Sequence, residues 1–257
     1  MSIICSYDDD RKALISPENC YEKSEFTLDA CVLTFSQKTI EVLLEKGLIT
    51  KLGETIIKSV ALDYPMYVFK DTNIGVFKST VGAPITSGMI EEISHVYNCN
   101  KIVMFGSCGG LDKSISPNKL IVPTHAYRDE GTSYHYMPAS DYIEIKNATK
   151  VGKILNELNI DFVYGKTWTT DAFYRETQKN MSARKSEGCI AVEMEVSACQ
   201  AVASFRDIEF YNFLYRADNL DSEKWDRGIL GLISIDDRIK NFFVALEIAK
   251  RIICKIA

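Results

Sequence analysis

The sequence predicts an α/β protein in which a mostly parallel or mixed β-sheet is covered by helices. Short runs rich in β-branched and aromatic residues alternate with longer segments whose apolar residues recur every three or four positions. Alternation of this kind is typical of sheets with helices packed on them. The 257 residues, 46% of them hydrophobic, suffice for one large core, and no linker or repeat divides them. We therefore expect a single domain over residues 1–257.

Seven runs are predicted to be strands because they are short, apolar and rich in β-formers. In chain order they are CVLTF (31–35), MYVF (66–69), IGVFKS (74–79), KIVMF (101–105), KLIVP (119–123), CIAVE (189–193) and FYNFLYRA (210–217). In open α/β sheets, ligands bind beyond the carboxyl ends of strands. The residues that follow these runs are therefore the first place to look for a site.

Five segments are predicted to be helices because their apolar residues share one face at helical spacing. They are KTIEVLLEKG (38–47), ITSGMIEEISHVY (85–97), ATKVGKILNELN (148–159), VSACQAVASF (196–205) and the terminal segment at residues 239–256. The terminal segment aligns Phe242, Leu246 and Ala249, so we expect it to pack on the core.

The acidic charge balance argues against a protein whose main partner is nucleic acid or an anionic membrane. The net charge is −5, the isoelectric point is near 5.4, and no segment carries a dominant basic stripe. The N-terminus lacks a signal core and no apolar run is long enough to span a bilayer, so we expect a cytoplasmic protein with a small-molecule partner. Eight scattered cysteines and three isolated histidines predict reduced thiols, no metal and no cofactor.

The strand predicted at residues 101–105 is followed by the glycine-rich stretch GSCGG, residues 106–110. Glycines permit a tight turn, and successive amide N–H groups in such a turn can hold an anion or the edge of a ligand. The stretch has neither the Gly-Lys-Ser/Thr of a Walker loop nor the GxGxxG spacing of a dinucleotide site. A turn that only reverses the chain explains it equally well, and Cys108 is expected to be a buried, unreactive thiol.

Two glutamates, Glu193 and Glu195, stand where a predicted core strand meets a predicted helix. The helix dipole favours a carboxylate in the first turn by roughly 0.3–1 kcal/mol, which accounts for one glutamate and not for two. An ionised carboxylate beside the end of a strand can accept two hydrogen bonds from a vicinal diol such as that of ribose. Glu195 is therefore a candidate diol-binding residue.

Asp218 directly follows the last predicted strand, in the stretch FLYRADNLD. An apolar setting can raise the pKa of a carboxyl group and let it act as a proton donor. Asp-Asn is also common turn chemistry, so a turn cap explains the same residue. Trp225, a few residues further on, is expected to anchor the loop after this strand.

Six segments, taken in order, resemble the nucleoside phosphorylase superfamily of uridine phosphorylases, hexameric purine nucleoside phosphorylases and methylthioadenosine nucleosidases. The segments are VGAPITSGMIEEI (81–93), FGSCGGL (105–111), RDEGTSYHY (128–136), TTDAFY (169–174), VEMEVSA (192–198) and ADNL (217–220). The resemblance runs from about Cys31 to the C-terminus and so covers nearly the whole chain. It implies a three-layer α/β fold with a central mixed sheet flanked by helices.

The resemblance also implies an enzyme that cleaves the N-glycosidic bond of a ribonucleoside, with phosphate as the default acceptor. It implies that Glu195 holds the ribose 2′- and 3′-hydroxyls and that Met194 packs against the sugar. Asp218 matches the aspartate that protonates or hydrogen-bonds N7 of a purine as the bond breaks, which favours a purine over uridine. Such cleavage passes through an oxocarbenium-like sugar, so the protein must neutralise the departing base and position a nucleophile.

For the base, the resemblance implies that Phe173 stacks on its face while Cys108 and Gly109 lie beside it. The Gln-x-Arg pair by which uridine phosphorylases read uracil is not matched after the Phe-Tyr pair. The candidates for reading the base edge are therefore Arg175, Glu176 and Gln178.

The phosphate site departs from the family pattern, because its arginines are missing. The first loop reads TFSQK instead of Gly-Asp-Pro-x-Arg, Met104 stands where a second arginine belongs, and no arginine occurs between Arg11 and Arg128. Without the bidentate guanidinium fork an anion site is weakened. The candidates for its replacement are Gly106, Ser107, Lys38 and Arg128.

Three functions therefore remain open on the sequence. A phosphorylase is the first, a nucleoside hydrolase of the same fold is the second, and a catalytically weakened nucleoside-binding protein is the third. The missing arginines favour the last two, whereas the presence of both Glu195 and Asp218 favours an enzyme. The resemblance also implies a homo-oligomer, either a dimer or a hexamer.

Overall fold

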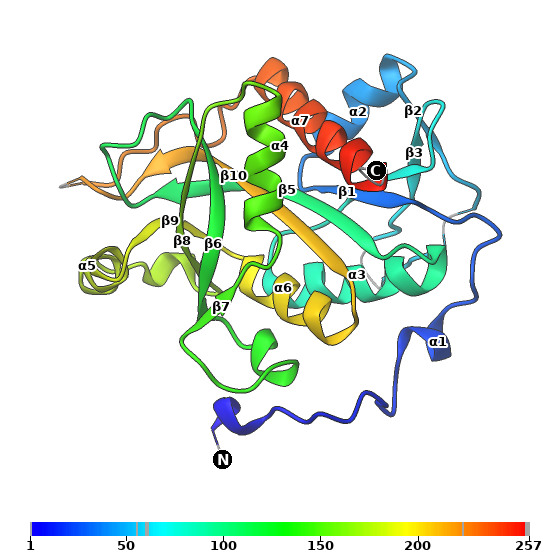
Figure 1. Cartoon of the computed structure of the whole chain (residues 1–257), viewed down its shortest axis with the longest axis horizontal. Helices are drawn as coiled ribbons and strands as arrows, with labels where there is room; N and C mark the ends of the chain where they lie inside the picture. The colour runs from blue at the N-terminus through cyan, green and yellow to red at the C-terminus, as the bar shows by residue number, and fades with distance from the viewer. Residues whose placement is uncertain (1, 55, 60–61, 223, 255–257) are drawn as a thin grey trace.

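The computed structural model describes residues 2–54, 56–59, 62–222 and 224–254. Within these residues the centre of the molecule is a mixed sheet of ten strands, ordered β10-β6-β8-β9-β5-β1-β4-β3-β2, with β7 paired to β6 (Figure 1). The strands are β1 (Ala30–Thr34), β2 (Ile49–Lys51), β3 (Tyr67–Phe69), β4 (Ile74–Lys78), β5 (Lys101–Gly110), β6 (Leu120–Asp129), β7 (Tyr142–Glu144), β8 (Phe162–Thr170), β9 (Cys189–Glu193) and β10 (Glu209–Asn219).

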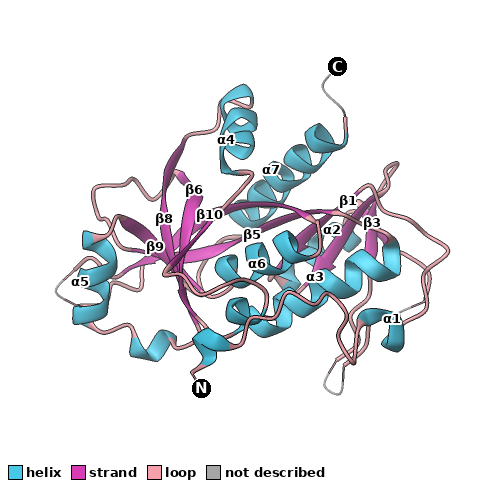
Figure 2. Ribbon diagram, turned by 60° about the horizontal axis from the view of Figure 1, so that its bottom comes forward, coloured by secondary structure: helices cyan, strands magenta, loops and turns pink. Residues whose placement is uncertain are grey.

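Helices cover both faces of the sheet, as Figures 1 and 2 show, and so make the outer two of three layers. On one face α7 packs on β1 and β5, α2 packs on α7, and α4 packs on β6 and β10. On the other face α3 and α6 pack against each other, and α6 also contacts β10. The helices are α1 (Pro17–Cys20), α2 (Gln37–Glu45), α3 (Ala83–Tyr97), α4 (Ala148–Glu157), α5 (Gln178–Ser186), α6 (Val196–Phe205) and α7 (Ile235–Ile253).

Five strands of the sheet form a closed ring through their pairings. The sequence does not predict this closure. Strand β10 pairs with β5 in parallel and with β6 antiparallel, and β9 pairs with both β8 and β5. The ring therefore runs β5-β10-β6-β8-β9. The ladder between β10 and β5 shifts register between Arg216 and Asp218, where a bulge re-aims the last residues of β10.

The predicted α/β class and the mixed, helix-covered sheet are confirmed. Strand 189–193 and helix 196–205 have the predicted bounds, and most other elements agree within two residues. Three strands are longer than predicted at their carboxyl ends: β5 continues to Gly110, β6 to Asp129 and β10 to Asn219. Strands β2, β7 and β8 and helices α1 and α5 were not predicted, and residues 255 and 256 of the predicted terminal helix lie outside the described residues.

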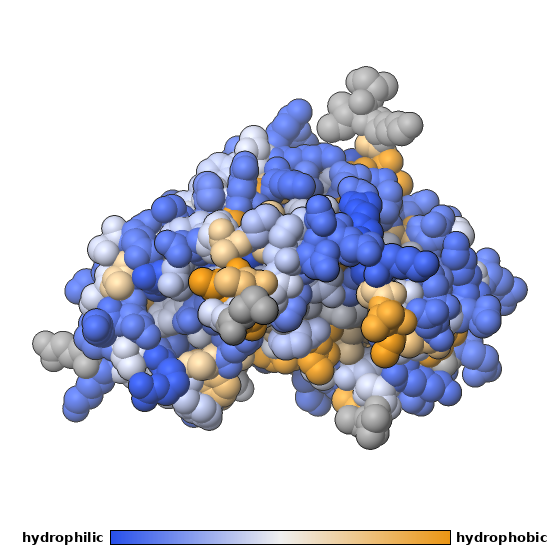
Figure 3. Space-filling model, turned by 90° about the horizontal axis from the view of Figure 1, so that it is seen from below, coloured by the Kyte–Doolittle hydropathy of each residue, from blue (hydrophilic) through white to orange (hydrophobic). Residues whose placement is uncertain are grey.

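The core of the molecule is apolar. All five residues of β1 are buried, and the core continues across β5, β10 and the inner faces of the helices. The eight cysteines are free thiols, five of them buried. No helix in the described ranges is long and apolar enough to cross a membrane. The face shown in Figure 3 is largely hydrophilic, with hydrophobic side chains gathered in a few separate patches.

Candidate active site

A cavity of about 730 Å³ opens at the carboxyl-terminal halves of β1, β5, β9 and β10. Its wall includes residues 34–36, 104–109, 192–195, 214–215 and 217–218, which come from these four strands and the residues just after them. Parallel strands bring their carboxyl ends to one edge of a sheet, and β1, β5 and β10 run parallel to one another. The cavity therefore lies at the edge where the sequence predicts a ligand site.

The glycine-rich stretch 106–110 is part of β5, which corrects the prediction of a turn. It forms a strand because β10 pairs with it along one side and β9 along the other. A Cβ atom on Gly109 would lie 2.6 Å from Leu220 Cδ1 and 2.9 Å from Val192 Cγ1, so the glycine permits this close packing. Ser107 is the exposed residue of the stretch, and it lines the cavity.

Glu193 holds the start of α6. Its Oε2 accepts hydrogen bonds from the backbone N–H groups of Glu195 and Val196, both at 2.7 Å. Its Oε1 accepts from the hydroxyls of Thr169 and Thr167 on β8, at 2.5 and 3.3 Å. Burial raises the pKa of Glu193 to about 7, against these hydrogen bonds. One of the two glutamates is thus explained by helix capping and by the junction of β8 with β9.

Replacing Glu193 with alanine is expected to destabilise the fold by roughly 3 kcal/mol, because two buried N–H groups and the Thr169 hydroxyl lose their acceptor. The measurement is the free energy of unfolding in urea. Glu41→Ala is the matched control, since Glu41 lies on the surface and pairs with Lys38, and it should change stability by less than about 0.5 kcal/mol. Equal stabilities of the two variants would contradict the assigned role of Glu193.

Glu195 is the second glutamate and lines the cavity. It is 7% exposed and stands at the N-cap of α6, where its Oε1 accepts a hydrogen bond from Gly82 N–H at 2.7 Å. Gly82 is the N-cap residue of α3 and has φ +120°, a conformation that L side chains rarely adopt. Burial and then the charge of Glu193 raise the pKa of Glu195 to about 8. In either protonation state the carboxyl group can pair with two hydroxyls, by two accepted bonds or by one accepted and one donated.

Asp218 lies within β10, one residue past the bulge, and not after the strand as predicted. It pairs with Gly109 in the ladder, and its Oδ2 accepts a hydrogen bond of 2.7 Å from Trp225 Nε1. Burial raises the pKa of Asp218, and the bond from Trp225 opposes this shift. Trp225 also lines the cavity, so the tryptophan predicted to anchor the loop contacts the candidate proton donor directly.

The base-pocket candidates divide into two groups. Cys108, Gly109, Phe173, Glu176 and Gln178 line the cavity, and so does Met194. Phe173 is 48% exposed and contacts Tyr174, with ring centroids 4.1 Å apart. Burial and the charge of Asp218 raise the pKa of Glu176 to about 7. Arg175 is exposed and is not among the described residues of the cavity wall.

Cys108 has the environment of an unreactive thiol. It is buried, and its pKa is raised by burial and then by the charges of Glu193 and Asp218. A thiolate nucleophile needs the opposite shift.

Two of the phosphate-site candidates lie elsewhere. Arg128 is 3% exposed and donates hydrogen bonds to Ser133 Oγ, Ser140 Oγ and the carbonyl oxygens of Pro138 and Met137. These bonds fix the loop after β6, which corrects the expectation that Arg128 serves an anion. Lys38 is exposed on α2 and pairs with Glu41 at 3.2 Å. Neither residue is in the described wall of the cavity, whereas Gly106 and Ser107 are.

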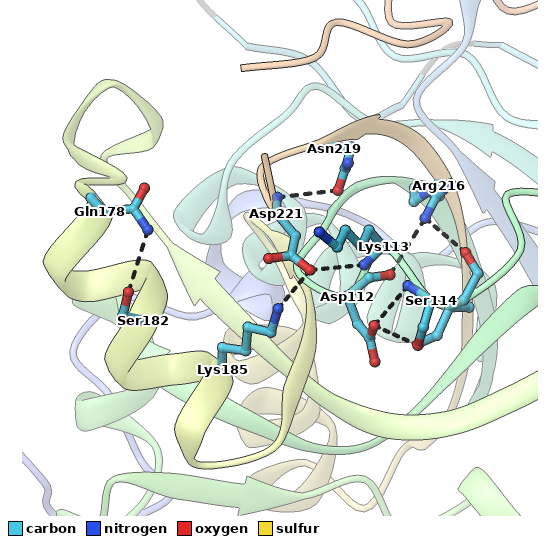
Figure 4. Close-up of polar contacts among 10 residues, drawn as sticks. Asp112, Lys113, Ser114, Gln178, Ser182, Lys185, Arg216, Asn219 and Asp221 are labelled. Atoms are coloured by element: carbon cyan, nitrogen blue, oxygen red, sulfur yellow. Dashed lines mark hydrogen bonds and ion pairs between the residues drawn. The ribbon is translucent and has the colours of Figure 1, made fainter. Parts of the chain in front are cut away.

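Ion pairs and hydrogen bonds join segments that also contribute the cavity residues Gln178, Leu220 and Ser222 (Figure 4). Lys185 of α5 pairs with Asp221, which also accepts a hydrogen bond from the backbone N–H of Lys113. These contacts join α5, the segment after β10 and the segment after β5. Arg216 is likewise occupied, because it donates to the carbonyl oxygen of Ile115 at 2.8 Å.

The cavity wall includes polar residues that the sequence analysis did not single out, among them Ser36, Tyr215 and Arg238. It also includes Trp225, whose contact with Asp218 was not predicted. Ser36 and Tyr215 could have been found by their places at the carboxyl ends of two predicted strands. Arg238 has no local signal, because it reaches the site from the terminal helix. No group of three or more metal-ligating side chains occurs in the described parts of the chain.

Comparison with known proteins gives relatives that include purine nucleoside phosphorylases. Over 170 residues the chain is 28% identical to an uncharacterized protein of Acanthamoeba polyphaga mimivirus, covering 65% of this chain and 66% of the relative. Over 139 residues it is 27% identical to a DeoD-type purine nucleoside phosphorylase of Aliivibrio fischeri, covering 53% and 58%. The chain thus spans less than two thirds of the length of these relatives.

Solved structures share the fold over most of the chain. Purine nucleoside phosphorylase from Toxoplasma gondii in complex with immucillin-H is similar with a TM-score of 0.70 and 20% identity, covering 88% of this chain and 90% of the other. AMP nucleosidase from Bacteroides thetaiotaomicron is similar with a TM-score of 0.69 and 16% identity, covering 88% and 89%. The profile of the phosphorylase superfamily matches residues 29–254. The chain therefore belongs to the phosphorylase superfamily.

Proposed function

We propose that this protein is an enzyme that cleaves the N-glycosidic bond of a purine ribonucleoside, with phosphate as the default acceptor. The observation that carries the proposal is that three kinds of group line one cavity: the buried carboxyl of Glu195, the ring of Phe173, and the carboxyl of Asp218. A ribonucleoside presents a diol, an aromatic face and a basic ring nitrogen to match them. Superfamily membership supports the same reaction class, since the enzymes of this superfamily cleave N-glycosidic bonds.

In this mechanism Glu195 binds the 2′- and 3′-hydroxyls and fixes the sugar, and Phe173 stacks on the base. Protonated Asp218 donates its proton to the purine as the C1′–N bond breaks and the electron pair passes to the base. An oxygen of phosphate forms the new bond to C1′, and the proton lost by phosphate restores Asp218. The products are the free base and ribose 1-phosphate.

Hydrolysis is the second candidate, and the observation that favours it is the lack of family arginines in the first loop and at Met104. Water would then attack C1′ and release free ribose. The solved AMP nucleosidase is structurally similar to the chain, in keeping with this alternative.

Base release from a panel of purine and pyrimidine ribonucleosides, with and without phosphate, tests the proposal. We expect purine release that depends on phosphate, with ribose 1-phosphate as the sugar product. Free ribose at a phosphate-independent rate would replace phosphorolysis by hydrolysis. Saturable nucleoside binding without release of any base would support the nucleoside-binding protein instead.

The pH dependence of turnover should depend on Trp225, which stabilises the ionised form of Asp218 through its N–H. Trp225→Phe removes this bond, so the pKa of Asp218 rises further. Because the protonated form donates to the base, the basic limb of the kcat profile should move to higher pH. Tyr174→Phe, at an exposed aromatic residue of the same cavity, is the control and should leave the limb in place; an unmoved limb in Trp225→Phe contradicts the mechanism.

We also propose that the chain forms a homo-oligomer. Tyr174, Trp225 and Phe173 line the cavity with 89%, 59% and 48% of their surfaces exposed, and a second copy can cover such apolar surface. A monomeric mass by light scattering at micromolar concentration would contradict this proposal.

A further inference from the structure

Arg238 supplies a cationic side chain to the cavity from the first turn of the terminal helix α7. It lines the wall near Ser36, the N-cap residue of α2, and its Nη1 donates a hydrogen bond to Ser36 Oγ at 3.2 Å. Its Nε donates to the carbonyl oxygen of Ile233, also at 3.2 Å. Among the described residues of the wall, Arg238 is the one lysine or arginine, in contrast to four carboxylates.

Some N–H groups of the Arg238 guanidinium have no acceptor among the described residues. A guanidinium carries five N–H groups, and the hydrogen bonds within the described chain use Nε and Nη1. No carboxylate of the described residues forms an ion pair with it. Arg128 and Arg216 differ from Arg238, because their guanidinium groups donate hydrogen bonds to backbone carbonyl oxygens of neighbouring loops. A half-buried cation without a counter-ion favours an anionic ligand.

Three hydroxyl-bearing residues line the cavity together with this cation, namely Ser36, Ser107 and Tyr215. Ser107 on β5 is exposed to the cavity and stands opposite Tyr215 on β10 in the ladder. Tyr215 also lines the cavity, and the charge of Arg238 and a hydrogen bond with Ser107 both oppose the burial that raises its pKa. One cluster of hydrogen-bond donors therefore consists of Ser107, Tyr215, Ser36 and Arg238. The cluster joins the N-terminus of α2, strands β5 and β10, and helix α7.

We propose that Arg238, with Ser36, Ser107 and Tyr215, binds a phosphate group in this cavity. The planar guanidinium offers the fork that pairs with two phosphate oxygens, and the hydroxyls can donate to the others. The inference rests on the proposed function and assigns to α7 the charge that the family's missing arginines would supply. The phosphate is either the inorganic co-substrate or the 5′-phosphate of a nucleotide substrate, which share this chemistry.

Arg238→Gln tests the site by calorimetric titration with inorganic phosphate, with a purine nucleoside 5′-monophosphate and with the nucleoside. We expect phosphate or nucleotide affinity to fall roughly tenfold or more, while nucleoside affinity changes less than about twofold. Arg238→Lys keeps the charge without the fork, so it should recover part of the affinity. Arg251→Gln, on the same helix and paired with Glu157, is the matched control and should bind as the wild type does.

Product analysis separates the two sources. If the site holds inorganic phosphate, Arg238→Gln raises KM for phosphate in a reaction that forms ribose 1-phosphate. If it holds a 5′-phosphate, the nucleotide is cleaved without added phosphate and its KM rises. Either result supports the site.

Unchanged affinity of Arg238→Gln for both anions would overturn the inference, as would a wild-type protein that binds neither. Should the Gln variant fail to fold, wild-type affinity in Arg238→Lys overturns it equally. Because anion binding is measured without turnover, the phosphate-binding site and the proposed reaction can be contradicted independently. Anion binding that depends on Arg238, without base release, would overturn only the proposed reaction.

Discussion

Replacing Asp218 with asparagine is expected to lower kcat by about a hundredfold or more, with nucleoside affinity changed by less than about threefold. Asparagine has nearly the same shape and can still accept the hydrogen bond from Trp225, but it has no acidic proton for the departing base. The loss should therefore appear in kcat, because the proton moves in the transition state. Steady-state kinetics together with equilibrium binding of the nucleoside measure both quantities.

Asp112→Asn is the matched control for this variant. Asp112 accepts hydrogen bonds from Ser114 on the loop after β5, and it is not among the described residues of the cavity wall. It should retain near wild-type turnover. Equal turnover of Asp218→Asn and the wild type would show that Asp218 is a structural residue at the end of β10, as its turn-cap interpretation holds.

Replacing Glu195 with alanine should lower kcat/KM for ribonucleosides by about a hundredfold, which corresponds to roughly 3 kcal/mol for two hydrogen bonds to a carboxyl group. The same change should affect a 2′-deoxyribonucleoside much less, because the deoxy sugar already lacks one of the two hydroxyls. The measurement is kcat/KM for both sugars with wild type and variant.

The deoxy substrate controls for indirect damage to the site. Glu195 accepts a hydrogen bond from Gly82, so its loss could also disturb the start of α3. Disturbance of that kind would lower kcat/KM equally for both sugars. An equal loss, which would leave the preference for the ribonucleoside unchanged, would therefore contradict the diol assignment.

The architecture could be predicted because it depends on local periodicity. Helix α6 and strand β9 have their predicted bounds. The boundary between them could be predicted because the apolar run of the strand changes to small residues at helical spacing within a few neighbouring positions. Strand β8 was missed because its sequence, FVYGKTWTT, contains Gly165 and Lys166 and lacks a clear pattern. It is a strand because β6 and β9 pair with it on either side, and Gly165 leaves room for Ile190.

The site could be predicted only in part for the same reason. Glu195 and Asp218 stand near strand ends, so position alone indicated them. Cavity contacts made across the chain gave no such signal: Arg238 and Ser36 are 202 positions apart. Arg128 was predicted to bind an anion because no local pattern shows that its guanidinium donates hydrogen bonds to the loop after β6.

A single-turnover reaction tests the central claim most directly. The protein is mixed in excess with a purine ribonucleoside and phosphate, the reaction is quenched over time, and base and sugar are separated by chromatography. The account predicts that free purine appears in step with loss of nucleoside in the wild type, and more slowly by about a hundredfold in Asp218→Asn. Bound purine ribonucleosides recovered intact, or purine released equally fast by both proteins, would contradict it.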